Sequence, residues 1–71
     1  MEKISIKAIH EKTGNAVNLY GFPVFAGEAL VGFVCGDSDR GFEGYRLIGE
    51  KIVTGYYGFR TRKQAFEYAN S

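Results

Sequence analysis

The chain has 71 residues, of which 45% are hydrophobic and 15% aromatic, and its formal net charge is +1. This length allows one domain, residues 1–71, and the aromatic content excludes a disordered chain. A single cysteine excludes an internal disulfide, and no stretch approaches the roughly 20 apolar residues that cross a bilayer. We therefore expect a cytoplasmic protein with no membrane partner.

Alternation of apolar and polar residues predicts strands through most of the chain. Period two over 3–11 predicts a first strand, and turn residues at 12–15 lead to a second strand from Ala16 to about Phe22. Pro23 cannot donate a ladder hydrogen bond, so we expect it at a strand end or on an edge. Further strands are predicted over 30–35, 42–48 and 52–57, separated by a connection at 26–29, a loop at 36–41 and a turn at 49–50.

The clearest local signal lies at the C-terminal end. Thr61 and Gln64 fit a capping box, in which the Thr61 hydroxyl accepts from the Gln64 amide and the Gln64 side chain reaches back to the Thr61 amide. Ala65, Phe66 and Ala69 then fall on one helical face. A helix this short does not form alone in water, so it must pack on the sheet. The sequence predicts an α+β fold, an antiparallel sheet of four to five strands with one short C-terminal helix packed on one face.

Residues that could catalyse a reaction or bind a metal ion are few. His10 and Cys35 are single residues whose spacing does not pair a nucleophile with a base, so we expect Cys35 to be a small buried hydrophobe and His10 a polar strand-end residue. The segment 37–43 resembles the start of a calcium loop, but Gly41 and Ile48 stand at ligand positions. We expect no enzyme, no cofactor and no metal site.

Charge is distributed unevenly along the chain. Residues 28–43 carry a net charge of −3, and residues 44–71 carry +3. Three of the cations cluster at the start of the predicted helix, where the helix dipole disfavours them. A conflict of this kind indicates a site for an anion or a partner, although solvated surface charges are the alternative. The predicted site consists of Arg60, Thr61, Arg62, Lys63, Tyr56 and Tyr57, with the two tyrosines on opposite faces of their strand.

Residues 55–66, a strand that runs into a capped helix, resemble the ending of small three-stranded DNA-binding domains. Examples are the arm-type domain of phage integrases and the AP2 type, which read DNA with the sheet. The resemblance covers only these residues of the 71-residue chain. The Trp and the dense Arg and Lys residues usual on such sheets are missing here.

These observations favour a small binding module. Our first prediction is protein–protein interaction, either with a protein partner or by self-association as a homodimer through free strand edges. A net charge near neutral and the small number of base-reading side chains support this choice. Nucleic-acid binding through the basic end and exposed tyrosines is the alternative, and a steep fall of affinity with salt would distinguish it.

Overall fold

The computed structural model describes residues 2–10, 14–49 and 51–71, except for the side chains of His10 and Val17. The predicted turns at 12–15 and 49–50 lie partly outside these residues. The His10 side chain, which was predicted to be a polar residue at a strand end, also lies outside the described part of the structure. Five strands precede one helix: β1 (Ile4–His10), β2 (Ala16–Ala26), β3 (Ala29–Asp37), β4 (Gly41–Ile48), β5 (Lys51–Phe59) and α1 (Arg62–Ala69). Within the described residues, no helix is long and apolar enough to cross a membrane.

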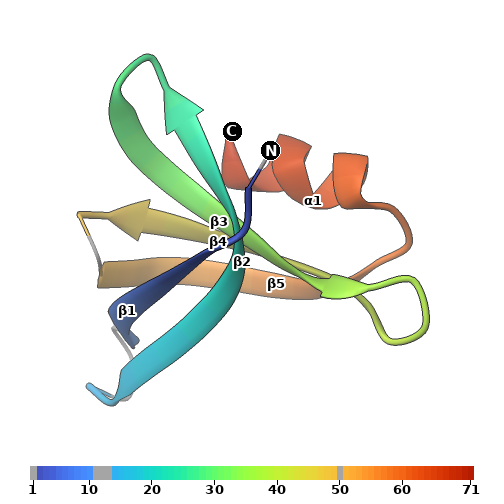
Figure 1. Cartoon of the computed structure of the whole chain (residues 1–71), viewed down its shortest axis with the longest axis horizontal. Coiled ribbons are helices and arrows are strands. Elements are labelled where there is room, and N and C mark those ends of the chain that lie inside the picture. The colour runs from blue at the N-terminus through green and yellow to red at the C-terminus, as the bar shows by residue number, and fades with distance from the viewer. Residues whose placement is uncertain (1, 11–13, 50) are drawn as a thin grey trace.

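The five strands form a meander that closes into a barrel (Figure 1). Each strand pairs antiparallel with the next, and β1 pairs parallel with β5 at Ile9–Lys51 and His10–Ile52. The predicted α+β class, with antiparallel strands and one short C-terminal helix, is confirmed. The closure between the first and last strands was not predicted, because it results from the accumulated twist of the whole sheet.

Two apolar clusters lie on opposite faces of the sheet. Inside the barrel the buried residues are Ile6, Ala8, Phe33, Leu47 and Ile52. Between the outer face and α1 they are Val24, Val34, Phe42, Ala65 and Ala69. Successive strand residues point to opposite faces, so neighbours such as Phe33 and Val34 contribute one to each cluster. The face opposite the helix is therefore largely covered by the sheet itself, where the sequence had suggested an exposed face.

Two glycines allow α1 to lie unusually close to the outer face. A Cβ atom on Gly32 would be 2.7 Å from the Cβ and from the carbonyl oxygen of Ala69. A Cβ atom on Gly44 would be 2.8 Å from the carbonyl oxygen of Ala65. Real Cβ atoms essentially never approach other atoms this closely, so only glycine fits beneath the helix at these positions.

Strand β2 continues four residues beyond its predicted end at Phe22 and includes Pro23. Pro23 is buried and lies opposite Phe33 of β3. On the other side of β2, no residue of β1 pairs with Pro23. The pairing of β1 with β2 begins at Ile4, which lies opposite Gly21. The predicted strand end was wrong, but the proline still occupies a local edge, where its missing N–H is tolerated.

The helix begins with the predicted threonine cap. The Thr61 hydroxyl accepts from the Gln64 amide at 3.2 Å. The Gln64 side chain, however, accepts from the Arg60 amide at 3.1 Å, one residue before the predicted donor. Ala65 and Ala69 are buried against the sheet and Phe66 is half-buried, so the predicted apolar face of the helix is confirmed.

Candidate binding surface

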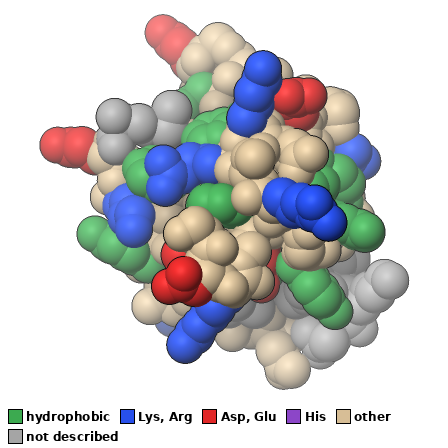
Figure 2. All heavy atoms as spheres, turned by 90° about the vertical axis from the view of Figure 1, so that its right-hand side faces the viewer, with side chains coloured by type: hydrophobic (Ala, Val, Ile, Leu, Met, Phe, Trp, Pro, Cys, Tyr) green, Lys and Arg blue, Asp and Glu red, His purple; other side chains and the backbone are tan. Residues whose placement is uncertain are grey.

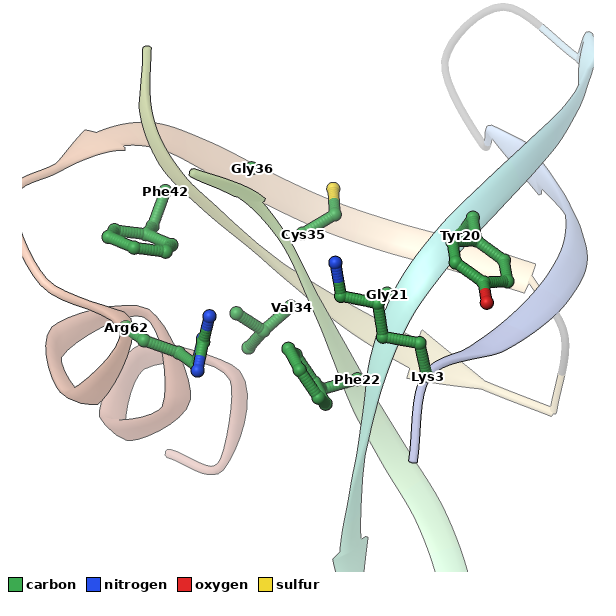
Figure 3. A pocket seen from close by; sticks show the side chains of 9 residues that line it. All are labelled: Lys3, Tyr20, Gly21, Phe22, Val34, Cys35, Gly36, Phe42 and Arg62. Atoms are coloured by element: carbon green, nitrogen blue, oxygen red, sulfur yellow. The ribbon is translucent and has the colours of Figure 1, made fainter. Parts of the chain in front are cut away.

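Arg62 from the predicted site lies against the sheet. Its guanidinium carbon lies 4.6 Å from the centre of the Phe22 ring and 5.6 Å from that of Phe42. Lys3 reaches the same Phe22 ring from the other side, with its Nζ 5.6 Å from the ring centre (Figure 3). These cation–π contacts give both side chains a role in covering apolar rings. Arg60 and Lys63 are exposed.

The acidic loop between β3 and β4 lies beside this basic end. A Cβ atom on Gly41 would lie 3.4 Å from the carbonyl oxygen of Phe59, at the end of β5. Figure 2 views this end of the molecule, and Lys and Arg side chains are interspersed there with Asp and Glu. The acidic and basic segments of the sequence therefore largely offset one another in space.

Asp37 stabilises the acidic loop itself. Its Oδ1 accepts from the amides of Asp39, at 3.0 Å, and Arg40, at 2.8 Å, which is the pattern of an Asx turn. In the part of the chain that is described, no group of three His, Cys, Asp or Glu residues is placed to hold a metal ion.

The two tyrosines of the predicted site lie on opposite faces of β5, as expected. Tyr56 faces the helix side and forms the outer aromatic cluster with Phe59 and Tyr68, with ring centres 5.1 to 6.0 Å apart. The Arg46 guanidinium covers Tyr68 at 4.3 Å. Tyr56 nevertheless remains 57% exposed, so this cluster is open to solvent on part of its surface.

Tyr57 belongs to a second surface, which we call the inner row. Its members follow one another across the sheet on the barrel side, one per strand: Ile4, Gly21, Cys35, Glu43 and Tyr57. Tyr57 is 73% exposed and Ile4 38% exposed. The row lies at the end of the barrel where β1 and β5 have separated, so it ends at an open side.

Glu43 lies half-buried in the middle of the inner row. The Cys35 thiol donates to Glu43 Oε2 at 3.1 Å. Burial, together with the Glu43 carboxylate, raises the pKa of Cys35 to about 12. The same two causes raise the pKa of Tyr45 to about 12. Both groups therefore stay protonated at neutral pH, and the Cys35 thiol acts as a donor to Glu43.

The open side of the barrel is bordered by two strand edges. β1 and β5 pair at only two positions, near Ile9 and Ile52. Within the described residues, Ile4–Ala8 of β1 and Val53–Phe59 of β5 pair with no strand on that side. Their outward N–H and C=O groups border the inner row.

The structure thus divides the six residues of the predicted site. Thr61 caps the helix, Arg62 covers Phe22, and Tyr56 and Tyr57 serve different surfaces. Glu43 was not predicted from the sequence to be part of a binding surface. The alternation along β4 could have indicated its position. Glu43 is two residues before Tyr45 and four before the buried Leu47, so its side chain points to the same inner face.

Comparisons with protein-family models, with curated proteins and with solved structures give no match for this chain. The resemblance of residues 55–66 to DNA-binding domains does not extend to the fold, because the strand before α1 belongs here to a five-stranded barrel. The sheet face turned away from α1 is the barrel interior, where Phe33 and Ile52 are buried. That face is closed to DNA over most of its area.

Proposed function

We propose that this chain is a non-enzymatic binding module whose partner is a protein, either a different one or a second copy of the chain. The observation that carries the proposal is the incomplete closure of the barrel. Two parallel residue pairs join β1 to β5, and the remaining edge of each strand stays unpaired among the described residues. An extended segment of a partner could add itself to either edge.

Unpaired strand edges are energetically suited to this role. Each exposes backbone donors and acceptors at fixed spacing, so an incoming strand gains main-chain hydrogen bonds without distorting the barrel. Natural proteins usually block such edges with charged side chains or proline. Val53–Phe59 contains neither, and its sequence is Val-Thr-Gly-Tyr-Tyr-Gly-Phe.

The inner row adds side-chain contacts beside these edges. Tyr57 offers a large exposed ring, and Ile4 stands across the open side on β1. Tyrosine is enriched in protein interfaces because it contributes much contact area for little loss of side-chain entropy. A partner strand would therefore find both hydrogen-bonding groups and apolar surface.

Two other classes receive less support. Nucleic-acid binding is favoured by the outer aromatic cluster with Arg46, because exposed rings near a cation can stack on bases. It is disfavoured by the interspersed charges at the basic end (Figure 2). Catalysis by Cys35 is disfavoured because its raised pKa is opposite to that of a reactive thiol.

The neighbouring tyrosines provide a matched test. Tagged wild-type protein, Tyr57→Ser and Tyr56→Ser would be used to recover partners from lysate with and without nuclease, after sedimentation velocity of each protein alone. We expect Tyr57→Ser to lose the partner, or to abolish a dimer, while Tyr56→Ser retains it. Binding that is lost with Tyr56→Ser, removed by nuclease and steeply salt-dependent would instead establish the nucleic-acid alternative.

A further inference from the structure

The inner row contains a carboxylate where an apolar surface would be expected. Glu43 lies between Cys35 and Tyr57 in the register of the sheet, and it is half-buried. Its hydrogen-bond donor, the Cys35 thiol, is a neutral group. No ion pair to Glu43 is formed by any of the described cations. The carboxylate thus has a donor to hold it in place but no ion pair with a described cation.

A cavity opens beside this carboxylate. Its volume is about 310 Å³, and its lining includes Glu43, Tyr57, Asp37 and Arg40. This volume is at the lower limit for pockets that hold small molecules, so it suits a single long side chain. Two carboxylates and one guanidinium line it, which gives a net negative charge, and the Tyr57 ring borders it on the β5 side.

We propose that the partner is an extended protein segment with a lysine or arginine side chain that enters this cavity, pairs with Glu43 and lies against the Tyr57 ring. The inference rests on the proposed function, because the segment is held by the strand edges described above. The aliphatic stem of the basic residue covers the inner row, and its charged head meets the carboxylate near the open side.

Other side chains fit this position less well. An apolar residue would cover Glu43 and remove its solvent without supplying an opposite charge, which is costly. An acidic residue would be repelled by both Glu43 and Asp37. A cation gains attraction from Glu43 and from the face of the Tyr57 ring together.

Strand geometry extends the inference to the neighbouring residues of the segment. Side chains alternate between faces along a strand, so only every second residue of the partner points to the inner row. The residues directly before and after the basic one would then point away from the inner row.

The test uses two synthetic probes and one pair of protein variants. The basic probe is a seven-residue peptide of alternating Val and Thr with Lys in place of the central Val, and the acidic probe has Glu there. Binding to the ¹⁵N-labelled full chain is followed by amide chemical shifts. We expect the basic probe to shift the signals of Glu43, Tyr57 and β1, and the acidic probe to produce no saturable shift.

Glu43→Gln keeps the hydrogen-bond acceptor for Cys35 and removes the charge. It should weaken binding of the basic probe about tenfold, as expected for loss of a charge-assisted contact. Asp39→Asn, which removes the same charge from the adjacent loop outside the cavity lining, should change the Kd less than about twofold. Absence of saturable binding of the basic probe, or equal affinity of Glu43→Gln and wild type, overturns the inference.

The outcome can be separated from that of the proposed function. If a partner recovered from lysate depends on Tyr57 but binds Glu43→Gln as tightly as wild type, the binding module stands and the basic side chain is wrong. If the recovered partner depends on neither residue, both proposals fail.

Discussion

The close approach of α1 to β3 makes Gly32→Ala the most informative single substitution in this fold. The added methyl group would lie 2.7 Å from the Cβ and the carbonyl oxygen of Ala69, and 2.8 Å from the carbonyl oxygen of Tyr45. Ordinary van der Waals contact begins near 3.4 Å. The methyl group therefore fits only if the helix moves away from the sheet by about 0.7 Å or more and β4 also shifts at Tyr45.

The size of the effect follows from what the methyl group meets. Two of the three atoms are backbone oxygens, which cannot rotate away as the tip of a flexible side chain could. Overpacking of this kind typically costs about 1–3 kcal/mol. In a domain of this size about 1 kcal/mol corresponds to roughly 4–8 °C in Tm, so we expect Gly32→Ala to lower Tm by roughly 5–20 °C.

Thermal melts followed by circular dichroism, together with urea unfolding, measure this cost. The double variant Gly32→Ala/Ala69→Gly removes one of the three close contacts, so its loss of stability should be smaller than the sum of the two single losses. Gly32→Ala with a free energy of unfolding within about 0.5 kcal/mol of wild type would refute the packing of α1 on this glycine.

Two other predictions concern charge and pH. Lys63→Glu should raise the free energy of unfolding by about 0.3–1 kcal/mol at low salt, because it places a carboxylate in the first turn of α1. Arg62→Glu should give no such gain, because it loses the contact with Phe22. Equal gains for the two variants in urea titrations would contradict the role of Arg62 in covering Phe22. The pKa values of Cys35 and Tyr45 are raised to about 12 in the folded chain, so the unfolded chain releases these protons at lower pH than the folded chain does. The stability that these groups contribute is present below about pH 9 and should fall as the pH rises toward 12. Cys35→Ala should make that fall less steep in Tm measurements, and an unchanged slope would show that the thiol does not contribute.

Local sequence determined the secondary structure and one face of the packing. Period two predicts strands because side chains alternate across a pleated backbone, and the Thr61 cap predicts the helix start because a hydroxyl satisfies a free amide. Ala65 and Ala69 are spaced to share one helical face, and both are buried. Each of these features depends on residues within a few positions of one another, so a single sequence is enough to predict them.

Tertiary structure alone decided the closure of the barrel and the composition of the candidate surface. Ile9 meets Lys51 only after four hairpins have accumulated their twist, which no local pattern encodes. The same closure turned the second sheet face into an interior. The register of the β4–β5 hairpin placed Glu43 opposite Tyr57. That register also brought the acidic loop beside the basic end, so the charge separation that marked a site in the sequence became an interspersed surface in space.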